Sequence, residues 1–378
     1  MPHIQISNSQ DESQSQCSYY HLPITHHCIL TIKHKNSYIS SLGIGGKLLY
    51  TGSSDKEIQM LKRDNLRYEY DHENLNNSVI ITGKGAVKSL VVSADKIYSA
   101  HQDHRIRVWK VDENDAQQKK LTQLATLPTF SDRALTILTP KNHVQVRRHK
   151  KSTWVHHNDT VSALAVSRDG LVLYSVSWDR TLKIWRTTDF KCLESVANAH
   201  DDAINAIALS SHGDVYTGST DKKIKIWRKL KSPKGEKHSL IATLKKHRSG
   251  INALALSTDE NVLYSGASDR LIIVWEKSDD DDGMVVVCTL KGHVKSILCL
   301  SVVSDLLCSG SADETIRIWR GIEKCYFCLA VLEGHSGPVK CLTSETDHLS
   351  LSDASASYII YSGGLDSDVK VWQISIPL

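Results

Sequence analysis

The sequence lacks the features that would place the chain in a membrane or send it out of the cell. No apolar run approaches the roughly 18–20 residues that a membrane-spanning helix needs. The first residues, MPHIQISNSQDESQSQ, are polar and do not contain the apolar stretch of a signal peptide. The 46 basic and 42 acidic residues nearly balance, for a net charge of +4, whereas a nucleic-acid-binding protein normally carries a larger basic excess. We therefore expect a chain of the cytoplasm, the nucleus or both, without a membrane partner.

Motifs for cofactors, metals and catalytic groups are also missing. There is neither a glycine-rich phosphate-binding loop nor a G-x-S-x-G element. Four consecutive aspartates, residues 279–282, lack the glycine and terminal glutamate of a calcium loop. The nine cysteines are an odd number, which favours reduced thiols. Cys325 and Cys328 form a C-x-x-C pair, but a zinc site needs two more ligands at matching spacing, and the following CLAVLEGH predicts a strand. We expect no cofactor, no metal ion and no catalytic residue.

What the sequence does contain is one unit repeated seven times. In each copy a serine or threonine precedes an aspartate by four residues, and a large apolar residue follows that aspartate by six. The aspartates are Asp55, Asp103, Asp179, Asp221, Asp269, Asp313 and Asp366. They lie 42 to 76 residues apart, and four short strands with their turns need roughly 40–45 residues. The repeat predicts an all-β chain that forms a seven-bladed β-propeller.

The third copy illustrates how one blade is encoded. Small apolar residues alternate at its start, as in an innermost strand that is packed on both faces. Turn residues such as Arg168-Asp169-Gly170 separate the segments that follow. The four strands of this blade are predicted over residues 161–166, 171–176, 182–185 and 192–196.

A histidine stands four residues before the first apolar residue of the innermost strand in five copies. In the third copy the Trp185 indole can donate to Ser175, Ser175 to His157, and His157 to Asp179, so that no buried donor is unpaired. A nucleophilic triad uses the same groups, but a catalytic constellation occurs once per site, and five copies favour a structural role. The expected tetrads are His157, Ser175, Asp179 and Trp185; His200, Thr217, Asp221 and Trp227; His247, Ser265, Asp269 and Trp275; His293, Ser309, Asp313 and Trp319; and His335, Ser362, Asp366 and Trp372.

These residues, together with Gly292-His293 and Gly334-His335, make the chain similar to the WD40-repeat family over nearly all of residues 28–374. The first two copies depart from the pattern: His34 only approximates the histidine position, Gly83 occupies it in the second copy, and Leu61 replaces the first tryptophan. In most family members an aspartate follows the tryptophan, but here the residues are Lys110, Arg186, Arg228, Glu276, Arg320 and Gln373. The change removes the Trp-Asp-x-Arg box with which ubiquitin-ligase substrate receptors of this family bind their adaptor.

Both ends of the repeat region are expected to share the last blade. Only QISIPL follows Trp372, too little for a fourth strand, whereas residues 28–34 resemble the strand and histidine that lead into other blades. The N-terminal strand should therefore close the ring and leave no open edge. We expect a disordered polar tail over residues 1–21 and a propeller over residues 22–378. The expected blades cover approximately residues 34–70, 83–127, 157–196, 200–244, 247–290, 293–332, and 335–374 with 28–33.

An insertion, residues 128–156, separates the second and third blades. Ser131-Asp132 is expected to cap a short helix through Leu138, which Pro140 ends. The stretch LPTFSDRALTILTPKNHVQVRRHKK, with SVSWDRTLKIWR and AHDDAINAIALS, resembles the plant WD40 proteins of the JINGUBANG type. That resemblance implies a regulatory role in signalling or transcription, with transcription factors as clients.

The insertion also contains a basic run, Arg147, Arg148, Lys150 and Lys151. It is consistent with a nuclear-import signal, a phosphate or acidic-peptide contact, or a nucleic-acid patch. Alternatively, these charges form a solvated strand edge that prevents sheet-to-sheet aggregation.

Candidate partner-binding residues lie where the blades begin. Trp178 stands out, because a large aromatic residue in a turn is a frequent interface anchor; alternatively, it packs under the insertion. The equivalent residues of the other blades are Ser54, Gln102, Thr220, Ser268, Ala312 and Leu365. The channel entrance is expected to be lined by small residues, among them Ala203, Ala206, Gly250, Ala253, Pro338 and Cys341.

The sequence thus favours a monomeric, non-catalytic scaffold or adaptor that binds proteins or peptides, such as transcription factors or signalling proteins. A substrate receptor of a ubiquitin ligase is the alternative, and a nucleic-acid-associated factor or an enzyme is less favoured.

Overall fold

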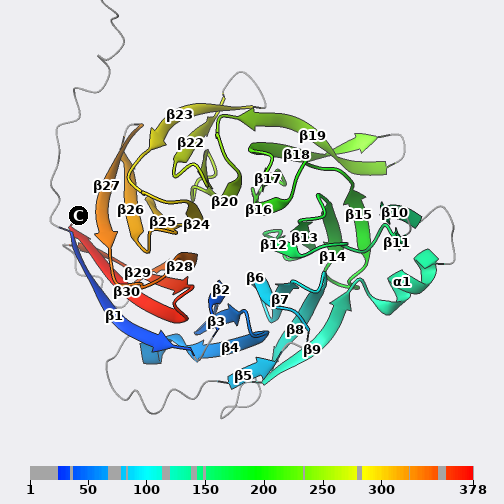
Figure 1. Cartoon of the computed structure of the whole chain (residues 1–378), viewed down its shortest axis with the longest axis horizontal. Helices are drawn as coiled ribbons and strands as arrows, with labels where there is room; N and C mark the ends of the chain where they lie inside the picture. The colour runs from blue at the N-terminus through cyan, green and yellow to red at the C-terminus, as the bar shows by residue number, and fades with distance from the viewer. Residues whose placement is uncertain are drawn as a thin grey trace, which may run out of the picture.

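The chain folds as an all-β propeller of seven four-stranded antiparallel sheets around a central channel, which confirms the predicted fold class (Figure 1). The computed structural model describes residues 24–34, 37–66, 78–81, 84–112, 120–137, 143–147, 150–232, 235–278, 283–322, 324–347 and 355–377. The expected tail, Gly83 and the aspartates 279–282 therefore lie outside the described residues.

Each blade is named by its order in the chain, and its strands are given from the channel outward. Blade 1 contains β2 (Ile39–Gly45), β3 (Leu48–Ser53), β4 (Glu57–Lys62) and β5 (Ser78–Ile81), and blade 2 contains β6 (Val87–Ser93), β7 (Lys96–His101), β8 (Ile106–Asp112) and β9 (Lys120–Leu127). Blade 3 contains β12 (Val161–Val166), β13 (Val172–Ser177), β14 (Leu182–Arg186) and β15 (Cys192–Val196), and blade 4 contains β16 (Ile204–Leu209), β17 (Val215–Ser219), β18 (Lys223–Ser232) and β19 (Gly235–Lys245). Blade 5 contains β20 (Ile251–Leu256), β21 (Val262–Ala267), β22 (Ile272–Lys277) and β23 (Met284–Leu290), and blade 6 contains β24 (Ile297–Val303), β25 (Leu306–Ser311), β26 (Ile316–Ile322) and β27 (Cys325–Leu332). Blade 7 contains β28 (Val339–Thr346), β29 (Ser355–Gly364), β30 (Asp368–Pro377) and β1 (Thr25–Lys33).

The hydrophobic core lies between neighbouring blades. One apolar cluster joins Leu48 and Tyr50 of blade 1 to Leu90 and Trp109 of blade 2, and equivalent clusters occupy the other six interfaces. The second strand of each blade is covered on both faces, and every residue of β3 is buried. This arrangement explains why these strands are almost continuously apolar or small.

The N-terminal strand closes the ring, as the sequence predicted. β1 pairs antiparallel with β30, from Lys33 opposite Asp368 to Thr25 opposite Ser375. Blade 7 is therefore built from both ends of the described chain, and β2 and β28 lie side by side at the channel (Figure 1).

The insertion forms helix α1 (Phe130–Ile137) and a hairpin of β10 (His143–Arg147) and β11 (Lys150–Thr153), on the outer side of blade 3 in Figure 1. The predicted cap at Ser131-Asp132 is wrong. Thr129 Oγ1 caps the helix by accepting the Asp132 backbone N–H at 3.2 Å. The Asp132 carboxylate instead accepts the backbone N–H of Cys192 at 3.2 Å and so fastens α1 to blade 3.

Candidate functional site

The predicted tetrads come together as hydrogen-bonded chains in blades 3 to 7. In blade 3 the Trp185 indole donates to Ser175 Oγ at 2.8 Å, and Ser175 Oγ lies 2.8 Å from His157 Nε2. His157 Nδ1 lies 3.3 Å from Asp179. In blades 4 to 7 the imidazole–carboxylate distances are 2.8–2.9 Å. Each chain connects the third strand of a blade to the loop that leads into its first strand.

The tetrad carboxylates are fully engaged. In blade 6, Asp313 Oδ2 accepts the backbone N–H of Val294 at 2.9 Å, and Oδ1 accepts the Thr315 hydroxyl at 2.7 Å. Burial by itself would raise the pKa of Asp313, but these hydrogen bonds and His293 lower it to about 2. Burial lowers the pKa of His293 against the attraction of Asp313. At neutral pH the pair therefore consists of a carboxylate and a neutral imidazole that donates from Nδ1, an arrangement suited to a structural role.

Blade 2 forms a comparable chain with a histidine that the sequence analysis missed. The Trp109 indole donates to Ser99 Oγ at 2.8 Å, and Ser99 Oγ lies 2.8 Å from Nε2 of His101. His101 occupies the position at which blade 3 has Ser177, two residues before the turn aspartate, and this unusual residue was the available signal. Asp103 pairs with the Arg107 guanidinium at 2.5 Å, whereas the equivalent aspartates of blades 3 to 7 pair with the tetrad histidine.

Blade 1 lacks the chain. Among the described residues, neither His34 Nε2 nor Thr51 Oγ1 has a hydrogen-bond partner, although both atoms are buried. Leu61 takes the tryptophan position. The replacement of the indole donor leaves the hydroxyl without the group that it accepts from in the other blades.

The rim at this end of the propeller is held by a ring of equivalent backbone hydrogen bonds. In each blade the residue before the turn aspartate donates its N–H to the carbonyl just before the innermost strand, as Trp178 does to Thr160 at 3.1 Å. The other donors are Ser54, Gln102, Thr220, Ser268, Ala312 and Leu365. This ring places the turns between second and third strands beside the loops that carry the tetrad histidines.

Large apolar side chains are exposed on this rim. Trp178 is 42% exposed, Leu365 45% and Val294 68%. Trp178 is thus partly exposed to solvent. A polar turn would not expose such groups, so they mark candidate contact points.

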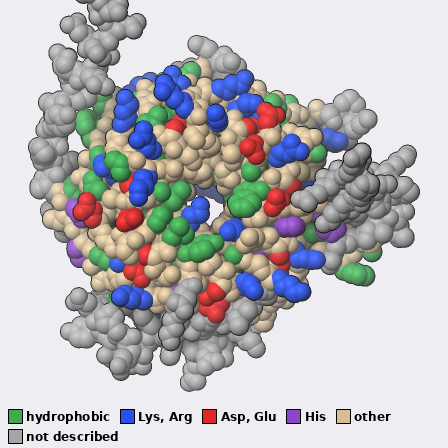
Figure 2. Space-filling model, viewed as in Figure 1, with side chains coloured by type: hydrophobic (Ala, Val, Ile, Leu, Met, Phe, Trp, Pro, Cys, Tyr) green, Lys and Arg blue, Asp and Glu red, His purple; other side chains and the backbone are tan. Residues whose placement is uncertain are grey.

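The central channel opens at the same rim and holds a cavity of about 250 Å³. Ala206, Ala253 and Cys341 line it as expected. Ala203, Gly250 and Pro338 lie in the loops above this cavity, where their carbonyls accept rim hydrogen bonds, and they are not among the residues that line it. Figure 2 shows the channel opening on one face, with hydrophobic and basic side chains around it.

The basic run lies in the hairpin of the insertion. Arg147 ends β10 and pairs with Lys150 of β11, and Lys151 is opposite Gln145. Arg148 lies outside the described residues. The structure therefore separates this run from the rim residue Trp178 and places it on a different element.

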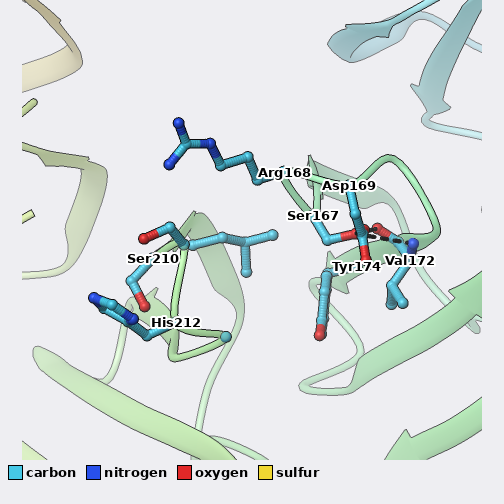
Figure 3. A pocket seen from close by; sticks show the side chains of 10 residues that line it. Ser167, Arg168, Asp169, Val172, Tyr174, Ser210 and His212 are labelled. Atoms are coloured by element: carbon cyan, nitrogen blue, oxygen red, sulfur yellow. Dashed lines mark hydrogen bonds between the residues drawn. The ribbon is translucent and has the colours of Figure 1, made fainter.

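A second cavity of about 500 Å³ lies at the opposite end, between the first turns of blades 3 and 4. Figure 3 shows Arg168 and Tyr174 facing Ser210 and His212 across it. Asp169 is not free there, because its carboxylate accepts the Ser167 hydroxyl at 2.5 Å and the backbone N–H of Leu171 at 2.9 Å.

Among the described residues, no group of three or more histidine, cysteine or acidic residues is arranged to hold a metal ion. Cys325 and Cys328 lie in β27, and no disulfide bond joins any of the eight cysteines that the structure describes. No helix of the described chain is long and apolar enough to cross a membrane.

Seven four-stranded blades, with His–hydroxyl–Asp–Trp chains in five of them, define a WD-repeat propeller. The family model for the WD domain, G-beta repeat, matches residues 148–186, 190–228, 238–276, 284–320 and 326–373. These segments make up more than half of the sequence, and the chain belongs to the WD40 family. WD40 propellers are typically non-catalytic and generally bind proteins or peptides.

Two relatives show how far the similarity extends. Apoptotic protease-activating factor 1 of Danio rerio is 25% identical over 386 residues, which cover 97% of this chain and 28% of that protein. An uncharacterized WD repeat-containing protein of Schizosaccharomyces pombe is 25% identical over 228 residues, which cover 58% of this chain and 58% of that protein. The chain thus spans less than two thirds of the length of these relatives.

Proposed function

We propose that the protein is a non-catalytic interaction scaffold whose partners bind at the rim around the tetrad end of the channel. The observation that carries this proposal is the exposure of Trp178, Leu365 and Val294 on that rim. Large apolar residues in polar turns are typical anchors of protein interfaces. The hydroxyl and carboxylate groups beside them are occupied in the tetrads and serve the fold.

We further propose a regulatory role in a plant cell, in the cytoplasm, the nucleus or both, with transcription factors or signalling proteins as clients. Its support is the similarity of the insertion and two blade segments to plant proteins of the JINGUBANG type. A monomeric propeller that brings two such proteins together would need only its rim and its insertion.

A proximity-labelling and pull-down comparison in plant cells tests the rim. Trp178→Ala removes the exposed indole and keeps the backbone bond to Thr160. Leu171→Ala is the matched control, since Leu171 is 51% exposed on the same blade at the opposite end. We expect Trp178→Ala to lose partners that Leu171→Ala retains. Identical partner sets for the wild type and both variants would reject the rim as the partner-binding surface.

The basic run is proposed as a nuclear-import signal or an acidic-protein contact. Changing Arg147, Arg148, Lys150 and Lys151 together to alanine should reduce nuclear accumulation of a fluorescent fusion or remove a subset of partners. If both localisation and partners stay unchanged, these charges serve only to keep a strand edge solvated. The alternative function is that of a substrate receptor of a ubiquitin ligase, and the Trp-Asp-x-Arg box that such receptors use is absent from the sequence. Recovery of a ligase adaptor among the partners would favour this alternative.

A further inference from the structure

The second residue of each innermost strand forms a ring around the channel, close to its mouth. The seven residues are Ser40, Lys88, Ser162, Asn205, Asn252, Leu298 and Lys340. Four of them are small polar residues that fasten one blade to the next. Asn205 Nδ2 donates to the Ile251 carbonyl at 3.0 Å, and Asn252 Nδ2 donates to the Ile297 carbonyl at 2.8 Å. Their hydrogen-bonding groups are therefore directed into the wall.

Lys88 and Lys340 differ from these four, because they make no hydrogen bond to the next blade. They belong to blades 2 and 7, the two neighbours of blade 1, so both cations lie on the same side of the ring. Lys88 is positioned by Tyr38, with Nζ 3.4 Å from the phenol oxygen and 5.8 Å from the ring centroid. Lys340 is exposed, and no ion pair of Lys88 or Lys340 occurs within the described part of the chain.

The described residues that line the cavity supply no compensating negative charge. None of the residues that line it is an aspartate or a glutamate. Two cations without an acid in a narrow opening create a positive potential that attracts an anionic group. Next to this ring the cavity is bordered by residues whose side chains pack between the blades, namely Leu42, Leu90, Leu164, Ile207, Leu254, Leu300 and Leu342. Lys88 and Lys340 are the only charged residues among the described residues that line the cavity, so an anion would be held at the layer of the lysines.

We propose that the channel mouth binds an aspartate or glutamate side chain of a partner segment, with Lys88 and Lys340 contacting its carboxylate. Apolar residues on either side of that acid would lie on the rim against Trp178, Val294 and Leu365. This inference rests on the proposed scaffold function and specifies the chemistry of the partner: an extended peptide with one acidic residue between apolar residues. The carboxylate supplies the charge that the channel lacks, and the apolar contacts supply the burial.

The test uses random peptides displayed on phage and selected on the full-length chain. We expect the selected peptides to share an acidic residue flanked by apolar residues. One such peptide, synthesised, should bind the Lys88→Gln/Lys340→Gln variant at least about tenfold more weakly than the wild type. A Lys191→Gln/Lys237→Gln variant, which loses the same charge from exposed positions outside the channel lining, should bind like the wild type. The Lys88→Arg/Lys340→Arg variant should recover most of the affinity.

Replacing the acidic residue of the peptide by glutamine should weaken binding to the wild type and leave binding to the Lys88→Gln/Lys340→Gln variant unchanged. Peptides without an acid, or acidic peptides that bind this variant as tightly as the wild type, would overturn the inference and leave the scaffold function in place if Trp178→Ala still weakens them. Failure of the wild type to select any peptide would reject the rim as a peptide-binding surface, and the inference with it. Circular dichroism of each variant checks that the fold is retained.

Discussion

At the scale of single residues, the effect of a buried polar group on stability depends on whether its hydrogen-bond partners are present. Ser265 Oγ accepts the Trp275 indole at 2.8 Å and lies 2.8 Å from His247 Nε2. Thr51 occupies the same place in blade 1, but its hydroxyl has no partner. The hydroxyl at this position thus stabilises blade 5, whereas in blade 1 it is a buried polar group that destabilises the fold.

Replacing Ser265 by alanine should lower the free energy of unfolding by about 3 kcal/mol, because an indole N–H and an imidazole nitrogen lose a buried partner. Replacing Thr51 by valine, which has the same shape, should change it by less than about 0.5 kcal/mol or raise it. Urea unfolding measures both. Equal losses for the two variants would contradict a tetrad role for the serine.

His101 gives a second prediction at this scale, on pH. Burial, together with the charge of Arg107, lowers its pKa to about 4 from the ordinary 6.5. As the pH falls below 6.5 the unfolded chain binds a proton that the folded chain does not, so stability is full above this pH and declines towards pH 4. The free energy of unfolding falls by about 3 kcal/mol over this range. His101→Gln should remove this part of the pH dependence in unfolding curves between pH 7.5 and 4.5, whereas the slope due to the other histidines should remain.

The residue scale also shows where sequence reasoning succeeds and where it stops. Trp185, Ser175 and Asp179 were assigned correctly because strand alternation and turn geometry repeat in each copy, and a fixed spacing therefore means a fixed contact. His101 was missed because it reaches the same hydroxyl from within β7 instead of from the loop before the blade. A fixed sequence spacing cannot identify a contact that a residue from another part of the blade makes.

At the scale of elements, β1 is the piece that turns an open array into a ring. Eight of its nine residues pair with β30, and its Ile32 packs in the core between blades 7 and 1. Without β1, one edge of β30 and part of that core would be exposed to water. Exposed strand edges promote aggregation.

Deleting residues 1–33 should therefore make the protein insoluble or lower its melting temperature by at least about 10 °C, as the loss of several kcal/mol implies. Deleting residues 1–20 removes none of β1 and should be nearly silent. Thermal denaturation and the soluble yield of the two truncations give the comparison. Similar behaviour of both would argue against closure by β1.

Helix α1 provides another test among the elements. Thr129→Ala should lower the local stability of the helix by about 1 kcal/mol, because it removes the cap on the Asp132 N–H. Ser131→Ala, at an exposed position that does not cap the helix, should have a much smaller effect. Hydrogen exchange of the α1 amides measures the local stability of the helix in both variants. Faster exchange in Ser131→Ala than in Thr129→Ala would restore the cap that the sequence suggested.

At the scale of the whole molecule, the ring was predictable because seven equally built units can bury their faces only against one another. The lining of the channel was less so. A register shift near the start of each innermost strand, such as that between Ile204 and Ala206, changes which side chains face inward. Ala203 and its equivalents precede these strands and lie in the rim loops. Contacts between blades determine which side chains line the channel, and the sequence of a single repeat does not reveal these contacts.

Because the ring is completed by its own first strand, no blade requires a strand from a second copy. We expect light scattering to give one species with the monomer mass of 42.2 kDa. A dimer that persists on dilution would indicate that β1 pairs with β30 of another copy, whereas a dimer that dissociates readily on dilution would indicate a surface contact such as one at the rim.

The pairing of β1 with β30 also has a consequence for biosynthesis. β1 leaves the ribosome before all the other described strands, but its partner, residues 368–377, is translated only after the first six blades. The nascent polypeptide must therefore keep β1 unpaired until residues 368–377 have been translated. A factor that shields this segment in the meantime would favour correct maturation, and synonymous codons that slow elongation late in the message would prolong the exposed period.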